Sequence, residues 1–421
     1  MTKGDKKVKI TKTFIVIFFL LFFAASDQVF AQTQQGGNIQ LGNLKIIPNL
    51  TAQAIYDSNI YLKNGADELA NKKERDWIYH VKPGILLNYT IPERGRINLG
   101  YEGDWAFYQS NTNNNWKSQK VLFDGAYESP GGLILGANNL FMDSEDPYGD
   151  ANQYALGRVT KRWTDDLKTK AGYNFGKVFK VLLFYNLYKQ EYKSDLDFAQ
   201  NYSNNEFGLG VETRILSRTW GFVRYHYGER KYNTFYNGLT PDYNSDFTYH
   251  RATTGLTWDP SAKINGELNV GYQWKRYKNE FTDATQTARR DNNDTWVAAT
   301  NLIYKPLTTT KIILNIDRAV RDSNANTNEY FDDTGIGLTL KQTILTKLEL
   351  TVGGQYSENK YNLPVVDSRK DNNYIAIVAL DYNIQKWLTV GVSYKYWRKD
   401  SNIAVNEFRD DQGMVTLTLT Y

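Results

Sequence analysis

The sequence predicts an all-β fold, a transmembrane antiparallel β-barrel of about 18 strands in an up-and-down meander. Three observations support this prediction. The chain begins with an apolar segment that has the form of an export signal, most of the remainder alternates apolar and polar residues, and short turns alternate with long polar loops. A chain with these features is exported and then crosses a membrane with strands, which a closed barrel allows.

The composition excludes several classes of protein. The 421 residues include 31 Tyr, 20 Phe and 10 Trp, whereas disordered chains are poor in aromatic residues. The mean hydropathy of −0.57 is too low for a bundle of membrane helices. A formal net charge of +4 gives no reason to expect a nucleic-acid partner. Because the chain has no Cys, disulfides, thiolate metal sites and a lipoprotein anchor are excluded.

The N-terminal segment has the three parts of a secretory signal peptide. A Lys-rich start precedes an apolar run over residues 14–25, and the small-residue site Val29-Phe30-Ala31 follows. The alternative is a membrane anchor, but the run is shorter than the roughly 20 apolar residues that a spanning helix needs. We therefore expect export by the Sec pathway and cleavage after Ala31.

The predicted layout has three parts. Residues 1–31 are the signal peptide, and residues 32–45 are polar and rich in Gly, which predicts a flexible lead-in. Residues 46–421 then form one barrel, since no shift of composition marks a second domain.

The mature chain alternates with a period of two. In RINLGYEGDWAFY, residues 96–108, the odd positions are mostly apolar and the even positions mostly polar. The same pattern returns in residues 268–275 and 388–395. This period places the two sets on opposite faces of a strand. No helical period separates the strands, so the chain predicts an antiparallel meander.

The connections between strands alternate in length. Short turns are expected at residues 92–95, 129–132, 176–178, 216–218, 259–261, 306–308, 345–346 and 385–386. Long loops are expected around residues 111–116, 143–163, 193–204, 234–246, 281–293, 323–328, 361–372 and 401–409. Outer-membrane barrels have short periplasmic turns and long extracellular loops. A count of about 18 strands returns both termini to the periplasm, and 16 stays open because one stretch divides in two ways.

The prolines agree with these turns, with one exception. Pro92, Pro130, Pro260 and Pro306 fall in predicted short turns, where no ladder N–H is needed. Pro83 lies inside an apolar strand pattern and predicts a bulge or a strand end.

The last strand alternates Val415, Leu417, Leu419 and Tyr421 with Thr residues. In a barrel these four side chains face lipid and the Thr side chains face the interior. The pattern resembles the terminal-strand signal by which barrel-assembly machinery recognises bacterial barrels for insertion. An ordinary exposed strand is the alternative, and the export signal together with the lack of Cys favours the insertion signal.

Short motifs in the first third of the mature chain carry a family likeness. They are Tyr56-Asp57-Ser58-Asn59-Ile60-Tyr61, Asp76-Trp77-Ile78, Val81-x-Pro83-Gly84-Ile85 and Arg94-Gly95-Arg96. With them the chain resembles the second "putative β-barrel porin" family of bacterial outer-membrane proteins, some described as exopolysaccharide-associated. The resemblance implies an outer-membrane barrel often found with polysaccharide synthesis and export machinery, so export components are expected partners.

Charged residues opposite the lipid-facing positions predict a wet interior. Both signs are present, and a barrel of about 18 strands is wide enough to hold water. A mixed polar lumen with Tyr and Trp near its ends suits neutral or weakly charged hydrophilic solutes, including sugars, without strong ion selectivity. The predicted lumen-facing residues are Glu102, Asp104, Lys120, Asp124, Lys170, Glu212, Arg214, Lys275, Asp317 and Lys395.

Two sets of residues near the predicted extracellular rim each have two interpretations. Basic residues there either bind phosphates of lipopolysaccharide or form a solvated rim; they are Arg75, Arg289, Arg290, Arg369, Lys370 and Arg409. Clusters of Asp and Asn either bind Ca²⁺ or, as we favour, make turns through hydrogen bonds to their own backbone; they span residues 291–294, 332–333, 371–373 and 410–411.

The sequence contains no catalytic constellation. Of the three His, His80 and His226 fall on the lumen face by strand phase and lack metal-ligand spacing. No nucleophile and base, paired carboxylates or phosphate-binding Gly loop stands out. We expect a protein that is not an enzyme and has no metal and no cofactor.

Two classes of function fit the sequence. The first is a channel of porin type in the bacterial outer membrane, passing hydrophilic solutes or exporting a polysaccharide. The alternative is a non-conducting structural or adhesive barrel, whose extracellular loops bind surface glycans and whose lumen is plugged by its own salt bridges. In either case the expected partners are outer-membrane lipid and lipopolysaccharide.

Overall fold

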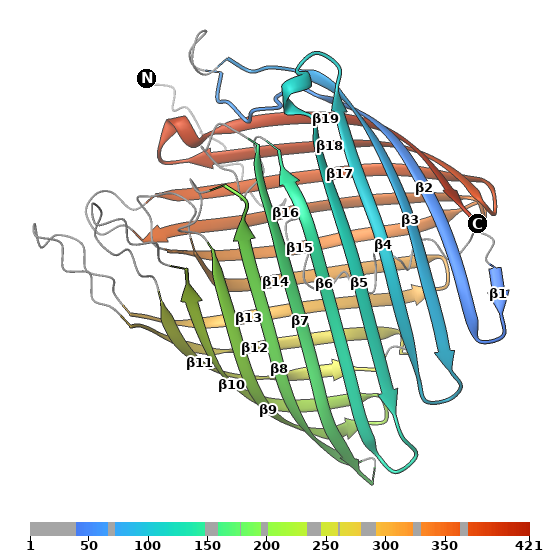
Figure 1. The fold of residues 1–421 in the computed structure, drawn as a ribbon, viewed down its shortest axis with the longest axis vertical. Coiled ribbons are helices and arrows are strands. Elements are labelled where there is room, and N and C mark those ends of the chain that lie inside the picture. Colours follow the sequence, from blue (N-terminus) through green and yellow to red (C-terminus); the bar gives the residue numbers. More distant parts are fainter. Residues whose placement is uncertain are drawn as a thin grey trace, which may run out of the picture.

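The computed structural model describes residues 39–65, 72–147, 159–176, 178–194, 201–233, 246–259, 262–278, 292–322, 330–362 and 369–421. Within these ranges, strands β2 to β19 each pair with the next strand in antiparallel fashion (Figure 1). The last strand, β19, pairs with the first, β2, and closes the ring. The predicted antiparallel barrel is therefore confirmed, with eighteen strands in the ring.

The strands are long enough to cross a membrane at a tilt. At about 3.3 Å per residue, even a 12-residue strand reaches about 40 Å, more than the apolar band of about 25 Å. In chain order they are β2 (Leu44–Asp57), β3 (Asp76–Ile91), β4 (Gly95–Tyr108), β5 (Trp116–Glu128), β6 (Leu133–Asp146), β7 (Thr160–Phe175), β8 (Phe179–Tyr192), β9 (Tyr202–Leu216), β10 (Thr219–Tyr232), β11 (Phe247–Trp258), β12 (Ile264–Tyr277), β13 (Asn293–Leu307), β14 (Thr310–Asp322), β15 (Tyr330–Ile344), β16 (Leu348–Asn362), β17 (Lys370–Gln385), β18 (Leu388–Ser401) and β19 (Phe408–Thr420).

Two short 3₁₀ turns lie in loops at one end of the ring. They are η3 (Thr112–Asn114), after β4, and η5 (Ala404–Asn406), after β18. Among the described residues, no helix has the length and apolar character that crossing a membrane requires.

The eight predicted short turns lie at or beside their expected positions. They join β3 to β4, β5 to β6 and so on around the ring, whereas the larger gaps between consecutive strands fall at the opposite ends of the strands (Figure 1). The alternation of loop lengths predicted from the sequence is thus the alternation of the two ends of the barrel.

Two prolines depart from their predicted places. Pro83 lies in the middle of β3, and the predicted bulge or strand end is wrong because the β3–β4 register is the same on both sides of it. Pro306 lies inside β13 rather than in a turn, beside a register shift between Tyr304 and Leu307.

The described chain enters the barrel through a short hairpin. β1 (Ile39–Leu41) pairs with the start of β2, on the same edge that β19 occupies further along. The backbone N–H of Tyr421 donates to the carbonyl of Pro48 at 3.0 Å, so β1 continues the line of β19 past the C-terminus. The lead-in expected to be flexible to residue 45 therefore contains strand from residue 39. The predicted signal peptide and its cleavage site lie outside the described residues.

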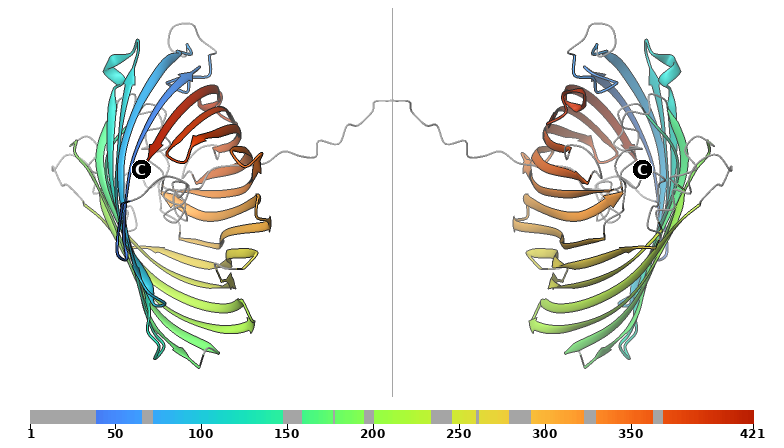
Figure 2. Two further views of the ribbon diagram at one scale, coloured as in Figure 1. Left: turned by 90° about the vertical axis from the view of Figure 1, so that its right-hand side faces the viewer. Right: turned by 90° about the vertical axis from the view of Figure 1, so that its left-hand side faces the viewer.

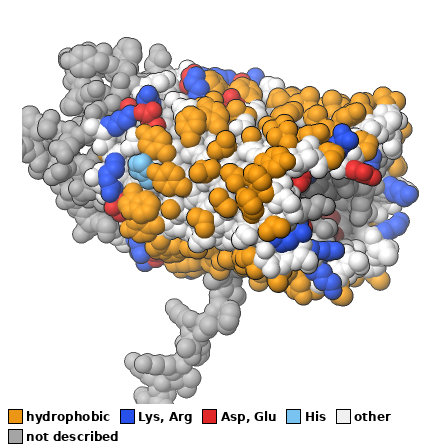
Figure 3. Space-filling view, turned by 90° about the horizontal axis from the view of Figure 1, so that it is seen from below, with side chains coloured by type: hydrophobic (Ala, Val, Ile, Leu, Met, Phe, Trp, Pro, Cys, Tyr) orange, Lys and Arg blue, Asp and Glu red, His pale blue; other side chains and the backbone are white. Residues whose placement is uncertain are grey.

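The outer face of the barrel is an apolar band between two charged ends. On the face shown in Figure 3, hydrophobic side chains spread over the middle of the wall, and Lys, Arg, Asp and Glu gather toward its ends. Outward aromatic residues near the long loops include Trp77, Tyr79, Phe107, Tyr225, Tyr272, Trp274, Trp296 and Tyr394. Near the short turns they include Tyr89, Tyr173, Phe175, Tyr304, Tyr382, Trp387 and Tyr421. Two aromatic girdles around an aliphatic band are typical of outer-membrane barrels.

The outward face predicts how a charge is tolerated. Val392 on β18 is 51% exposed between the girdles, and Ser393 beside it points to the interior. We expect Val392→Arg to lower the free energy of unfolding in lipid vesicles by about 2–4 kcal/mol, because the charge enters hydrocarbon. The matched variant Ser393→Arg places the same charge in the lumen and should change it by less than about 1 kcal/mol. Urea titration of the folded barrel in vesicles measures both, and equal losses would contradict the assignment of faces.

Candidate functional site

The inner wall of the barrel carries the polar side chains that the sequence assigns to a lumen. Successive residues of a strand point to opposite faces, so the inner face is the one opposite the exposed apolar residues. The strand register places ten predicted residues on this face: Glu102, Asp104, Lys120, Asp124, Lys170, Glu212, Arg214, Lys275, Asp317 and Lys395.

On β3 to β5, neighbouring strands exchange opposite charges. Asp104 on β4 contacts His80 Nδ1 at 2.8 Å and Lys82 Nζ at 3.3 Å, both on β3. Glu102, one inward position away, lies 3.3 Å from Lys120 of β5. The charges of this wall segment are thus neutralised by residues on adjacent strands.

A denser network centres on Glu206 of β9, which is 4% exposed. Its carboxylate accepts hydrogen bonds from Arg251 at 2.5 Å, from the Tyr249 hydroxyl at 2.7 Å and from Asn186 at 2.8 Å. His226 Nδ1 lies 3.0 Å from the same carboxylate. Four strands, β8 to β11, therefore converge on one acidic side chain.

Arg224 of β10 forms a second centre closer to the short turns. It binds Glu212 of β9 at 2.9 Å and Glu267 of β12 at 3.0 Å. Its guanidinium lies 3.8 Å from the centre of the Phe222 ring, so the cation is held by two carboxylates and an aromatic face. Such contacts orient the side chain along the wall.

Aromatic rings accompany the charges toward the long loops. Tyr202 stacks on Tyr188 with a centroid distance of 5.5 Å and lies 5.2 Å from the Tyr232 ring. Arg230 lies 4.2 Å above Tyr202. Close by on the same inner face, Arg162 binds Asp146 at 2.6 Å and Gln190 at 2.8 Å.

The ion pairs described above share one geometry. Each joins residues on adjacent strands or on two strands that have one strand between them, and none of them reaches across the ring. Strands β2 to β8 form one side of the ring and β11 to β18 the other (Figure 2). The charges are therefore neutralised within the wall that carries them.

Several of these central residues were missing from the sequence prediction. Glu206 lies six residues before Glu212 on the same strand, an even spacing that places both on one face. Arg162, Arg224 and Arg251 follow the same rule on their own strands. Strand phase is the signal in the sequence that finds them.

The basic residues predicted to bind lipopolysaccharide lie in different places in the structure. Arg75 is exposed, and Lys370 and Arg409 lie on the outer face, where they pair with Glu358 and Asp411. Arg289 and Arg290 lie outside the described residues.

For Arg369 the predicted contact is wrong. Its side chain is buried, binds both oxygens of Asp371 on the inner face and lies over the Tyr361 ring. It therefore offers no donor to a lipid outside the barrel.

The structure gives the acidic clusters a third explanation, which differs from both Ca²⁺ binding and turn formation. Arginine side chains bind most of these carboxylates: Arg276 with Asp294, Arg318 with Asp332, Arg321 with Asp333, Arg369 with Asp371, and Arg409 with Asp411. Within the described ranges, no group of three or more His, Asp or Glu side chains is placed to hold a metal ion.

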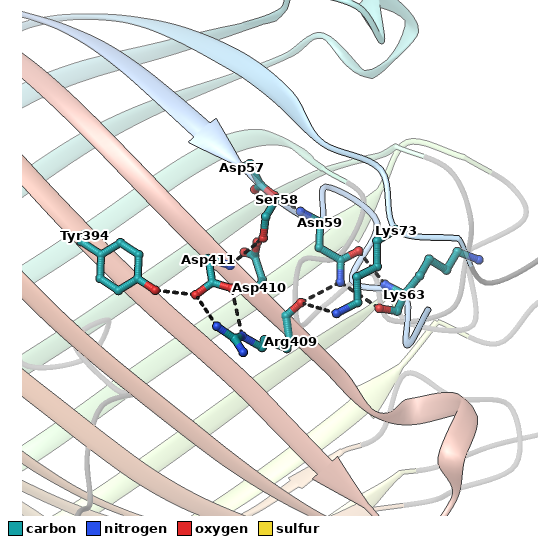
Figure 4. A network of polar contacts seen from close by, with 9 residues as sticks. All are labelled: Asp57, Ser58, Asn59, Lys63, Lys73, Tyr394, Arg409, Asp410 and Asp411. Atoms are coloured by element: carbon teal, nitrogen blue, oxygen red, sulfur yellow. Dashed lines mark hydrogen bonds and ion pairs between the residues drawn. The ribbon is translucent and has the colours of Figure 1, made fainter. Parts of the chain in front are cut away.

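The closing seam between β19 and β2 explains the first family motif (Figure 4). The Ser58 hydroxyl donates to Asp410 at 3.0 Å and accepts the backbone N–H of Asp411 at 2.8 Å. The Asn59 amide, fully buried, donates to the carbonyls of Arg409 at 3.0 Å and Lys63 at 2.8 Å. These residues therefore fasten the last strand to the first.

The second motif holds a neighbouring loop. Asp76 accepts hydrogen bonds from the backbone N–H groups of Trp77, Ser110 and Asn111, at 2.8 to 3.1 Å. One carboxylate thus joins the start of β3 to the connection that follows β4. These two motifs therefore serve the architecture of the barrel at its long-loop end.

The terminal strand presents its alternating residues as the pattern requires. Val415, Leu417, Leu419 and Tyr421 point outward, with Tyr421 62% exposed, while Thr416 and its alternating partners face the interior. The use of this strand as an insertion signal stays a prediction.

A family model described as "Putative beta-barrel porin 2" matches residues 34–421. The chain belongs to this family. Membership in this porin family indicates a barrel of a bacterial outer membrane, as predicted, and transport as the family's kind of activity. Sec export stays a prediction.

Two solved structures are similar in fold to this chain. The FrpB iron transporter from Neisseria meningitidis, as apoprotein, is 10% identical, with 91% of this chain and 82% of that chain covered at a TM-score of 0.51. A BenF-like porin from Pseudomonas fluorescens Pf-5 is 11% identical, with 89% and 99% covered and a TM-score of 0.47. At these identities the likeness to FrpB shows the fold alone. No curated protein matches the sequence of this porin-family chain.

The Glu206 network predicts an unequal cost of removing carboxylates. Glu206→Gln leaves Arg251 and His226 without their acidic partner in a buried setting, so we expect the free energy of unfolding to fall by about 3 kcal/mol. Asp400→Asn breaks only an exposed outer pair with Arg398 and should cost less than about 1 kcal/mol. Urea unfolding of the purified barrel in detergent compares them, and equal losses would mean that the network does not hold the wall together.

Proposed function

We propose that this barrel is an outer-membrane channel of porin type that passes hydrophilic solutes. The observation that carries the proposal is the pairing of inner charges along the wall rather than across the ring. A ring of eighteen strands leaves an aqueous channel unless something fills it. Charges of both signs on its inner face are affordable in contact with water, whereas a dry interior would make them costly.

The same observation weighs against the structural or adhesive barrel. That alternative requires the lumen to be plugged by the barrel's own salt bridges. The Glu206 and Arg224 networks instead extend over neighbouring strands and turn each charge toward its own wall. This arrangement of the strand side chains favours an open lumen over a plugged lumen.

Planar-bilayer recording tests the channel. We expect the purified barrel to give stable conductance steps with weak preference between ions, because wall charges of both signs largely cancel. A barrel that inserts correctly, as judged by protease protection, and stays silent would reject the proposal and favour the structural alternative.

Two cations near the short turns allow a sharper version of this test. Lys170 lies over Gly136 and Arg214 stacks on Trp220, and among the described residues neither binds a carboxylate. We expect Lys170→Glu with Arg214→Glu to raise the ratio of cation to anion permeability on the order of two-fold. The reversal potential in a salt gradient measures the ratio. The outer-face variant Arg398→Glu is the control and should leave it unchanged.

Export of a polysaccharide is the finer form of the proposal. Family resemblance suggests it. We expect deletion of the gene to lower the mass of secreted polysaccharide several-fold, with recovery on complementation. An unchanged yield, from a protein that conducts in bilayers, would leave a general diffusion pore.

A further inference from the structure

Above the aromatic girdle near the long loops, the outer rim carries a belt of charged side chains. In most places one basic side chain there binds one acidic side chain. Basic and acidic side chains pair there on outward positions. Examples are Arg276 with Asp294, Lys161 with Glu145, Lys189 with Glu191, and Arg398 with Asp400. A neutral belt attracts the anionic head groups of an outer leaflet only weakly.

The belt departs from this balance on strands β14 to β17. Glu358 of β16 binds two ammonium groups, Lys360 at 2.8 Å and Lys370 of β17. The adjoining pair joins Arg318 to Asp332, and Asp332 lies directly opposite Lys360 in the β15–β16 register. Among the described side chains of this patch, three cations therefore face two carboxylates, which leaves one positive charge.

The two lysines are also the accessible members of the patch. The side chains of Lys360 and Lys370 are 61% and 45% exposed, whereas Glu358 between them is 19% exposed. An ammonium group has three N–H donors, and one carboxylate uses only some of those on each lysine. An incoming anion can thus reach both lysines from outside the barrel.

Below the lysines the surface changes to aromatic and then to aliphatic. Tyr356 and Tyr374 point outward on β16 and β17, with ring centroids 5.4 Å apart. Val352 and Val378 continue the same outward faces toward the middle of the band, and both are exposed. The order is cation, aromatic ring and aliphatic chain, which matches a lipid whose phosphorylated head group lies above its acyl chains.

We propose that Lys360 and Lys370 bind the phosphate of an outer-leaflet glycolipid with the chemistry of lipid A, whose acyl chains lie against the column below. Charge complementarity and continuity with the lipid-facing band carry this assignment. The assignment depends on the outer-membrane location and not on conductance. It can therefore fail while the channel proposal stands, and the channel proposal can fail while the assignment stands.

The barrel contains a matched control for this patch. Glu229 of β10 likewise binds two lysines, Lys231 at 3.3 Å and Lys278 after β12. A second carboxylate, Asp246, lies close by. The hydrogen bond from Lys278 to Glu229 is the main cause that raises the pKa of Lys278 above its ordinary value, and the negative charge of Asp246 raises this pKa further. Two cations and two carboxylates balance, so the same Lys-Glu-Lys arrangement is neutral at this site.

Binding of lipid A to the purified, delipidated full barrel tests the proposal. Native mass spectrometry counts bound molecules during titration with bisphosphorylated lipid A. We expect Lys360→Gln with Lys370→Gln to weaken binding about ten-fold, because two surface cations are lost. Lys231→Gln with Lys278→Gln should change it less than about two-fold, and Lys360→Arg with Lys370→Arg should retain it. All variants are first checked for the compact, heat-modifiable form.

Four results would overturn the assignment. Equal losses in both glutamine double variants would mean a general effect of charge. Full binding by Lys360→Gln with Lys370→Gln would remove the lysines from the site. Dephosphorylated lipid A that binds as well as the phosphorylated form would exclude recognition of phosphate. Millimolar inorganic phosphate that displaces lipid A completely would indicate a site for free phosphate instead of a lipid.

Discussion

Satisfaction of backbone hydrogen bonds within lipid is the constraint on which the rest of this structure depends. A strand has two edges, and hydrocarbon offers no partner to either, so the sheet must close on itself. The closing pair joins Asn49–Asp57 of β2 to Gln412–Thr420 of β19, the most distant segments of the described chain. Ser58 and Asn59 add side-chain hydrogen bonds at the end of this pair. The motif that carries the family likeness thus lies where closure is completed.

The period of two follows from the same constraint and explains why so much of the fold can be predicted. Each strand separates lipid from water, so a shift of one residue would exchange every side chain between the two sides. Val415 and Leu417 face lipid while Thr416 faces the lumen, as alternation alone requires. Turn positions followed because Gly, Pro and Ser cluster between the alternating segments, and only the prolines inside β3 and β13 misled.

Prediction failed where the alternation fades. Above the girdle both faces of a strand meet water, so polarity no longer distinguishes inside from outside. Arg369 and Arg409 both lie two residues before an Asp at the start of a strand. The first pair turns inward and is buried, and the second turns outward and is exposed. Only the phase carried up from the apolar part of each strand decides this, and a list of rim residues ignores that phase.

The phase of the alternation along a strand also determines which medium surrounds each ion pair. On the inner face, Glu206 and Arg224 hold charges against the wall, where water in the lumen screens what their partners leave uncompensated. On the outer face, the lipid A site proposed above uses the same residue types, with Lys360 and Lys370 beside Glu358, to bind phosphate. A single residue step along β16 or β17 therefore separates side chains that face the interior from side chains that face the lipid side.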